Sequence, residues 1–242
     1  DKITEALAFM EAVGVTPETH PDLSRVEVFT SHEALLLEYE EALARIDSTT
    51  GTPVAGSGHM VWIGDRTRQP EGAHVEFMRG VRNPIGMKVS DKLPADELLR
   101  IIDQLDPQRE PGRLTLITRM GAGRVRRLLP PIIKAVEATG RSVVWCCDPM
   151  HGNTFETANG YKTRSFHDIC AEVNGFFDVH EELGTRPGGV HVELTGDDVT
   201  ECLGGTDALA ESDLGNRYET VCDPRLNRNQ SMELAQLVAD RL

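Results

Sequence analysis

The stretch CCDPMHGNT, residues 146–154, contains four side chains that can bind a metal ion within six positions: Cys146, Cys147, Asp148 and His151. The apolar run SVVW precedes it, so these residues are expected where a buried strand ends. They could form a metal site, a redox pair or only the end of a strand. Neighbouring strand residues point to opposite faces, so a disulfide between Cys146 and Cys147 would be strained.

Polar residues that can bind ligands also follow the other apolar runs. Asp65 and Arg66 come directly after VWIG, Lys88 ends PIGMK, and Arg119 follows LTLIT. Glu193 stands within VHVELT. A single basic residue at the end of a strand is more often solvated or ion-paired, but this succession of polar strand ends favours one common site.

The elements that would position these residues alternate along the chain. Apolar runs of strand length occupy 26–31, 60–64, 84–89, 114–120, 142–147 and 190–195. Helical patterns occupy 1–15, 32–46, 95–105, 123–140, 168–184 and 229–242. This alternation predicts an α/β fold with parallel strands. In a β/α barrel of the TIM type, the active site is built at the carboxyl ends of such strands.

The composition limits the class of function. The 242 residues are 39% hydrophobic, which is enough for one large core, and the net charge of −14 argues against a nucleic-acid partner. No apolar run approaches the roughly 18 residues of a membrane-spanning helix, so we predict no membrane segment. Five cysteines, an odd number, do not indicate a disulfide framework. We therefore expect a cytoplasmic protein with reduced thiols.

The polar strand ends divide into two chemical groups. Arg66, Lys88 and Arg119 are suited to bind carboxylate and phosphate oxygens. His151 and Glu193 offer the nitrogen and oxygen ligands that divalent metals accept, and Asp223 in YETVCDPRLN supplies a further acid. A basic pocket beside such a metal site suits an enzyme that binds a phosphorylated carboxylate and polarises a carbonyl group.

At these residues the chain resembles a known family. The motifs VWIGDRTRQPEGAHVEF, LTLITRMGAGRVRRLLPPII, CCDPMHGNT, GGVHVELTG, TECLGG and RYETVCDPRLN are similar to those of class II 3-deoxy-D-arabino-heptulosonate 7-phosphate (DAHP) synthases. The resemblance runs from about residue 1 to residue 242. It implies a (β/α)8 barrel that condenses phosphoenolpyruvate with erythrose 4-phosphate, using a divalent metal, in the first step of the shikimate pathway.

The resemblance also assigns roles. It places the metal ligands at His151, Glu193 and Asp223, and the phosphoenolpyruvate contacts at Asp65, Arg66, Lys88 and Arg119. Lys88 and His151 are then the expected catalytic residues. Manganese is the first choice of metal, although the donor set also accepts cobalt, iron or zinc.

The chain departs from the family in two places. Asp65 stands where the family usually has Glu, and the family's first two strands, with a metal-binding Cys and a Lys-Pro-Arg-Ser loop, have no counterpart here. We therefore expect about six of the eight βα units. They would form one catalytic domain over residues 1–242, with a flexible insert at about 47–59.

Several alternatives stay open at this point. The chain could be a fragment of a synthase, or a non-catalytic or complementing subunit that needs a partner chain. It could also be a related synthase that uses another aldose phosphate. We expect a homo-oligomer or a partner that supplies the missing strands. Cys146 and Cys147 are expected to pack the strand, the alternative being that they replace the family's metal-binding Cys, and Asp148 is expected to orient the turn or a metal ligand.

Overall fold

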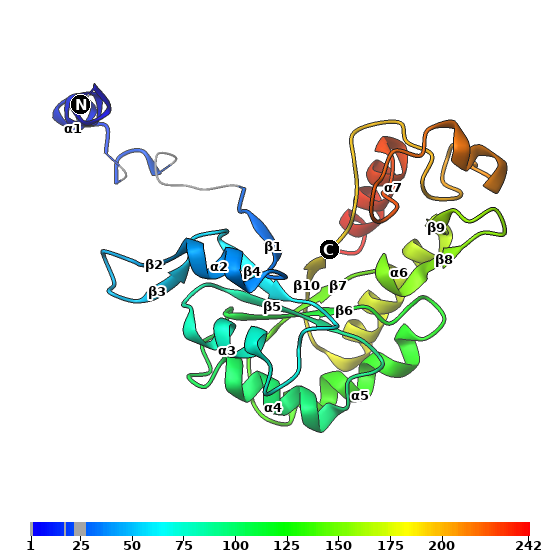
Figure 1. Ribbon diagram of the computed structural model, residues 1–242, viewed down its shortest axis with the longest axis horizontal. Helices are drawn as coiled ribbons and strands as arrows, with labels where there is room; N and C mark the ends of the chain where they lie inside the picture. The colour runs from blue at the N-terminus through cyan, green and yellow to red at the C-terminus, as the bar shows by residue number, and fades with distance from the viewer. Residues whose placement is uncertain (1, 17, 22–27) are drawn as a thin grey trace.

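The centre of the molecule is a six-stranded parallel sheet in the order β1-β4-β5-β6-β7-β10 (Figure 1). The structure is a computed structural model that describes residues 2–16, 18–21 and 28–242. The strands of the sheet are β1 Ser31–Glu33, β4 Met60–Ile63, β5 Ile85–Val89, β6 Leu114–Thr118, β7 Val144–Cys147 and β10 Pro187–Val190. The predicted α/β fold is confirmed, and in the described residues the parallel sheet forms part of a barrel that is not closed.

Two short antiparallel hairpins stand outside the sheet. One joins β2, Ala44–Ile46, to β3, Pro53–Ala55. The other joins β8, Thr154–Glu156, to β9, Lys162–Arg164. The second hairpin follows a short 3-10 helix, His151–Asn153, that leaves the end of β7. It therefore extends from the edge of the sheet at which the predicted site lies.

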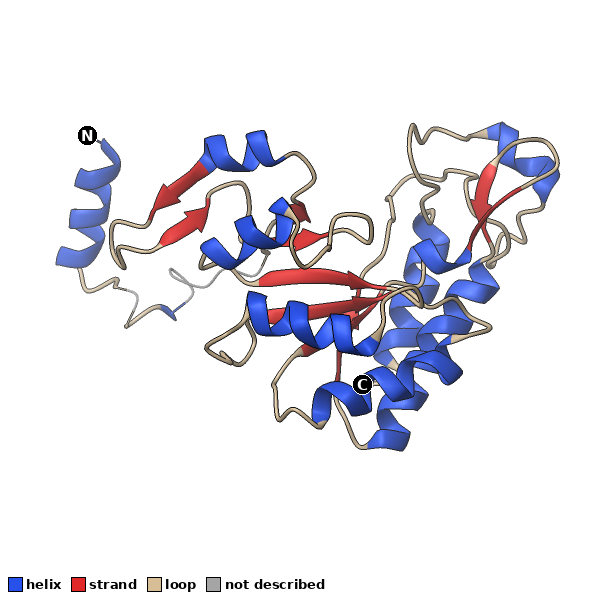
Figure 2. Ribbon diagram, turned by 60° about the horizontal axis from the view of Figure 1, so that its bottom comes forward, coloured by secondary structure: helices blue, strands red, loops and turns tan. Residues whose placement is uncertain are grey.

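The helices are α1 Lys2–Ala12, α2 Leu37–Leu43, α3 Ala73–Gly80, α4 Ala95–Leu105, α5 Val125–Glu137, α6 Phe166–Leu183 and α7 Arg228–Ala239, with a second 3-10 helix at Glu211–Asn216. Helices α3, α4, α5 and α6 lie along one face of the sheet, whereas α1 stands apart from it (Figures 1 and 2). In the described residues, no helix combines the length and the apolar character needed to cross a membrane.

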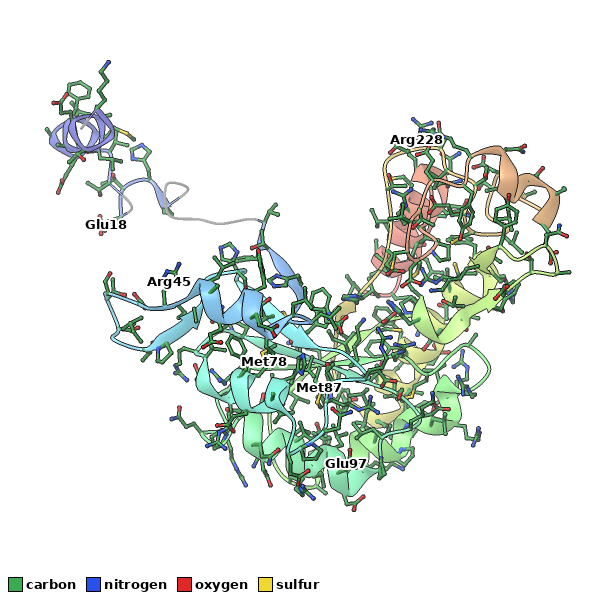
Figure 3. The ribbon with its side chains drawn as sticks, in the orientation of Figure 1. Glu18, Arg45, Met78, Met87, Glu97 and Arg228 are labelled. Carbon is green, nitrogen blue, oxygen red and sulfur yellow. The ribbon has the colours of Figure 1, made fainter. Side chains whose placement is uncertain are left out.

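The core lies between the sheet and helices α3, α4, α5 and α6. In α4, Leu98, Ile101, Ile102 and Leu105 are buried at the spacing of one helical face, which packs against the sheet. Met78 of α3 and Met87 of β5, both fully buried, lie in this layer (Figure 3). The apolar periodicity that predicts α4 therefore also determines which of its faces is buried.

The inner face of the sheet is less covered than the outer face. In β4 and β7 burial alternates, so that Val61 and Ile63 are buried while Trp62 is only partly buried. Cys146 of β7 is likewise partly buried. Because successive side chains of a strand point to opposite faces, Trp62 and Cys146 lie on one face of the sheet and the buried neighbours lie on the other.

Two predicted element boundaries are wrong. The predicted strand 26–31 falls partly outside the described residues, and β1 begins only at Ser31, where pairing with Met60 of β4 starts. The predicted helix 32–46 is shortened at both ends to Leu37–Leu43, because residues 32–33 belong to β1 and residues 44–46 form β2, which pairs with β3. Strand β3, which lies within the predicted insert 47–59, is held by Asn83, whose side chain bonds both the N–H and the carbonyl of Ala55.

The predicted strand 190–195 is also misplaced, since β10 spans Pro187–Val190. Strand β10 was not predicted at its true position because two of its four residues are glycines, which do not contribute to an apolar pattern. A side chain at Gly188 would stand 2.8 Å from the carbonyl oxygen of Trp145, so the close strand approach requires glycine there. The N–H of His191 still bonds Cys147, but Thr195 instead bonds Leu226, and the chain leaves the sheet.

Gly86 of the central strand β5 is equally constrained. A Cβ atom there would lie 2.8 Å from Cβ of Trp62 and 3.1 Å from Cδ1 of Ile117. We predict that Gly86→Val lowers the free energy of unfolding by about 1–3 kcal/mol, because overpacking displaces neighbouring strands. Urea unfolding measures this. Gly80→Ala, at a position with nothing within 4 Å, is the control and should leave stability unchanged or slightly raised. Equal stability of both variants would contradict the packing described.

Candidate active site

The carboxyl ends of the strands open into a cavity of about 560 Å³. Six of the seven predicted site residues line it, namely Asp65, Arg66, Lys88, Arg119, His151 and Asp223. Glu193 lines an adjoining cavity of about 370 Å³, which shares Cys222 and Asp223 with the first. The structure therefore brings together residues that are separated by more than 150 positions in the chain.

The hydrogen-bond ladder of the sheet delivers these residues to one edge. Lys88 lies on β5, and the N–H of Arg119 bonds the carbonyl of Val89 at 2.9 Å, one residue beyond β6. The N–H of Asp148 likewise bonds the carbonyl of Thr118 at 2.7 Å, one residue beyond β7. Because the last residues of β5, β6 and β7 (Val89, Thr118 and Cys147) pair with one another, the first residues that leave the ladder face the same space.

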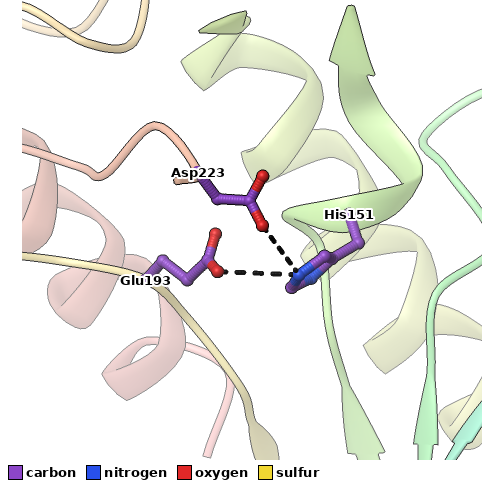
Figure 4. A group of neighbouring side chains, drawn as sticks. All are labelled: His151, Glu193 and Asp223. Carbon is purple, nitrogen blue, oxygen red and sulfur yellow. Dashed lines mark ion pairs between the residues drawn. The ribbon is translucent and has the colours of Figure 1, made fainter. Parts of the chain in front are cut away.

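His151, Glu193 and Asp223 form a cluster of possible metal ligands (Figure 4). Nε2 of His151 lies 3.5 Å from Oε1 of Glu193 and 3.7 Å from Oδ2 of Asp223. The three ligand atoms all lie within 4.8 Å of one another. Ligands bonded to one ion at about 2.1 Å stand roughly 3–4 Å apart, so the spacing and the nitrogen and oxygen donors fit a divalent ion.

Asp148 joins this cluster to the basic residues. Its carboxylate is fully buried, with Oδ2 2.8 Å from Nδ1 of His151 and 2.5 Å from Nζ of Lys88. Burial alone would raise the pKa of Asp148, but the hydrogen bond of His151 and the charge of Lys88 hold that pKa well below its ordinary value. When Nδ1 of His151 donates to Asp148, its Nε2 is left with a lone pair that faces the two acids.

The two acidic residues of the cluster have basic partners that the sequence interpretation missed. Glu193 pairs with Arg164 and Asp223 pairs with Lys162, both from β9. The Arg164 side chain is fully buried, donates to Oγ1 of Thr154 at 2.8 Å, and also bonds the carbonyl of Pro224. The NG turn in ETANGYKTR, which favours a hairpin, was the available signal for these two residues.

Glu201 holds the loop that carries Asp223. This carboxylate is fully buried and accepts hydrogen bonds from the backbone N–H groups of Glu219, Thr220 and Arg225 at 3.2, 2.9 and 2.8 Å. It also pairs with the guanidinium of Arg225 at 2.6 Å. Burial opposes ionisation, but these donors hold the pKa of Glu201 below its usual value. The loop that carries Asp223 is therefore held by a buried, fully paired carboxylate.

The basic residues surround the opposite side of the cavity. Lys88 is almost fully buried, with its Nζ 6.0 Å from the ring centre of Trp62. Arg119 is partly buried and bonds the carbonyl of His151 at 3.3 Å, while Arg66 is exposed. The Asp65 carboxylate pairs with Arg68. Asp65 therefore binds within its own turn, since its backbone carbonyl also accepts from Arg68.

Other residues singled out in the sequence fall outside the metal cluster. Cys147 is buried in the core, and burial raises the pKa of the Cys146 thiol to about 12. A thiol must lose its proton to bind a metal, so this burial supports a packing role for both cysteines. Glu33 lines the cavity, and Nε2 of its neighbour His32 lies 2.6 Å from Oε1 of Glu40.

Comparison with known proteins identifies the family. The chain matches the family model of the class-II DAHP synthetases over residues 1–239. It is 58% identical over 239 residues to the phospho-2-dehydro-3-deoxyheptonate aldolase of Streptomyces coelicolor, with 99% of this chain and 52% of that protein covered. It is 54% identical over 246 residues to the enzyme of the same name from Mycolicibacterium smegmatis, with coverages of 100% and 52%.

The chain spans about half the length of the curated relatives it matches. The match nevertheless extends over nearly all of its residues, and it includes the strand ends that line the cavity. The sequence resemblance is thus confirmed, and the chain belongs to the class-II DAHP synthetase family.

Proposed function

We propose that this chain carries the metal site and the phosphoenolpyruvate site of a DAHP synthase. Such an enzyme condenses phosphoenolpyruvate with erythrose 4-phosphate in the first step of the shikimate pathway. The observation that carries the proposal is that the His151, Glu193 and Asp223 cluster and the basic residues meet in one place, linked through Asp148. The family membership and the names of the relatives support the same reaction.

His151, Glu193 and Asp223 would hold one divalent ion, for which manganese is our first choice and cobalt, iron or zinc are alternatives. When bound, the ion would supply a Lewis acid for the aldehyde oxygen. Asp148 would keep the imidazole of His151 in the tautomer that binds metal. Lys162 and Arg164, which pair with the two acids, lower the repulsion between those acids.

Arg66, Lys88 and Arg119 would bind the phosphate and carboxylate of phosphoenolpyruvate, with Asp65 contributing through its turn. Three cations match an anion that carries both groups. Nζ of the buried Lys88 is paired with the carboxylate of Asp148. The buried ammonium would therefore orient the substrate from a fixed position rather than from a solvated side chain.

The chemistry is a condensation between the two substrates. C3 of phosphoenolpyruvate forms the new bond to the aldehyde carbon, and the aldehyde oxygen gains a proton to become a hydroxyl group. Water adds at C2, the bond from C2 to the phosphate oxygen breaks, and inorganic phosphate leaves together with a proton. The chain's own contribution is to hold the reacting carbons together and to balance the charge of the leaving phosphate, with Lys88 and His151 as the central residues.

The rival interpretations are less well supported. A non-catalytic subunit has no need of three possible metal ligands beside a cavity lined by basic residues, so the alternative of an inactive scaffold is not favoured. The aldose phosphate is proposed from the names of the relatives rather than from a contact in this chain. A cytoplasmic location belongs to the proposal, and the five free thiols support it.

We propose further that residues 1–242 form one barrel domain whose two sheet edges, β1 and β10, are covered by additional strands. These strands would come from the rest of a polypeptide of the relatives' length, from a second copy or from a partner chain. Half-buried inner residues such as Trp62 and Cys146 support this, since a closed barrel would enclose them.

The first test concerns the metal. His151→Ala should lower manganese affinity by at least about tenfold, because one of three protein ligands is lost. Titration against a competing chelator measures this affinity, and His167→Ala is the matched control because His167 is exposed outside the cavity. Equal affinity of the parent and His151→Ala would refute the assignment of the metal ligands.

The second test concerns the basic residues. Arg119→Ala should weaken phosphoenolpyruvate binding by about 2 kcal/mol or more, as expected for a charge-assisted bidentate contact. Calorimetry without turnover isolates this binding step. Arg127→Ala, an exposed arginine on α5, removes the same charge away from the cavity and should leave binding unchanged. Unchanged binding in Arg119→Ala would contradict the proposed contact.

The third test concerns the sheet edges. Unpaired buried backbone groups cost roughly 1–3 kcal/mol each, so residues 1–242 expressed alone should associate with themselves and lack synthase activity. The same residues joined to the strands of a full-length relative should be active and of defined size. Light scattering and an activity assay decide between these states. A monodisperse and active monomer of residues 1–242 would show that no further strands are needed.

A further inference from the structure

Glu172 is a buried carboxylate that none of the proposed steps uses. It lies on α6, is fully buried, and its Oε1 accepts the backbone N–H groups of Met120 and Gly121, each at 2.8 Å. Its Oε2 accepts Nδ2 of Asn153 at 2.7 Å. Glu172 therefore contacts two loops at once, the one that follows β6 and the one that follows β7.

Asn153 completes the connection between these loops. Its Oδ1 accepts the N–H of Ala122 at 2.9 Å, and its Nδ2 also donates to the carbonyl of Pro149 at 2.8 Å. Both polar atoms of the Asn153 side-chain amide are therefore hydrogen-bonded, the oxygen as an acceptor and the nitrogen as a donor. The Asn153 side chain cannot turn over without placing oxygen against oxygen and N–H against N–H.

The two loops are in direct backbone contact at this point. A Cβ atom on Gly152 would lie 2.6 Å from the backbone nitrogen of Gly121, and Gly121 has a φ of +87°. Arg119 stands one residue before Met120, and His151 stands one residue before Gly152. A shift of either loop would therefore change the position of Arg119 relative to His151. The two residues are already in contact, since Arg119 donates to the backbone carbonyl of His151 at 3.3 Å.

The hydrogen bonds and burial of Glu172 indicate that this residue does more than fill space in the core. In the part of the chain that the structure describes, its donors are three neutral amides rather than a cation. Burial raises the pKa of Glu172 to about 7, although the N–H groups of Gly121 and Met120 oppose the rise. An apolar side chain would fill the space without burying a charge, whereas the carboxylate selects one arrangement of its donors.

We infer that Glu172 is a positioning residue that sets Arg119 and His151 relative to each other, and so joins anion binding to metal binding. The inference rests on the proposed function, because the two residues matter to one reaction only if they bind its substrate and its metal.

The experiment uses Glu172→Gln in the protein at its natural length. Glutamine keeps the volume and one oxygen for the two backbone N–H groups, but its amide nitrogen faces the amide nitrogen of Asn153. Manganese affinity by chelator competition and phosphoenolpyruvate affinity by calorimetry should both fall about tenfold or more, the usual consequence of losing a residue that orients a ligand. Near-ultraviolet circular dichroism verifies that the variant is folded at the temperature used.

Two further variants separate positioning from general damage. Adding Asn153→Asp to Glu172→Gln restores an acceptor opposite the glutamine amide and keeps the bond to Ala122, so part of both affinities should return. Glu40→Gln makes the same change in a buried carboxylate that contacts His32 and Ser57, and it should leave both affinities unchanged. If Glu172→Gln does not fold, Asn153→Ala removes the same contact from the other side and should weaken both affinities.

The outcomes are distinguishable. A parent protein that binds neither manganese nor phosphoenolpyruvate refutes the proposed function, whatever Glu172 does. A parent that binds both, with unchanged affinities in Glu172→Gln, overturns the inference and leaves the proposed function intact. Loss in Glu172→Gln with no recovery in the double variant also overturns it. Joint loss with joint partial recovery supports it.

Discussion

The site depends on one buried carboxylate that two different groups share. Asp148 contacts Nζ of Lys88 on β5 and Nδ1 of His151 beyond β7, and it is fully buried. Its Oδ1 also accepts the backbone N–H groups of Met150 and His151, so this buried charge is fully paired, as a buried charge must be. When Nδ1 of His151 donates to Asp148, its Nε2 faces Glu193 and Asp223. Asp148 therefore links the proposed anion-binding residues directly to the proposed metal ligands, whereas Glu172 links the loops that carry them.

The parallel sheet brings Lys88, Asp148 and His151 together, and buried polar contacts then hold the loops beyond the strand ends. Residues 60 positions apart, Lys88 and Asp148, meet because β5, β6 and β7 are neighbours in register. Beyond the strand ends, buried side chains hold the loops through hydrogen bonds. Arg164 bonds both Glu193 and the carbonyl of Pro224, and Glu201 bonds the loop around Asp223. The ligands thus lie on loops, but buried charged groups hold these loops in place.

Much of this arrangement was predictable from the sequence. Apolar runs identify the strands that end near Lys88, Arg119 and His151, because buried parallel strands are continuous apolar segments and the residue after each one enters the site. The glycine-rich β10 was misplaced, since its pairing depends on close approach to Trp145 rather than on apolar side chains. Arg164 was missed because its partner Glu193 lies 29 residues away, and local patterns carry no information about such pairs.

We propose that one metal ion and phosphoenolpyruvate bind on either side of Asp148. Anomalous diffraction from crystals of the protein at its natural length, grown with manganese and phosphoenolpyruvate, tests it most directly. The account predicts one manganese peak bonded to Nε2 of His151, Glu193 and Asp223, with Nδ1 of His151 still on Asp148 and the phosphoenolpyruvate anion on Lys88 and Arg119. A manganese peak elsewhere, or an imidazole turned away from Asp148 in the bound state, would contradict it.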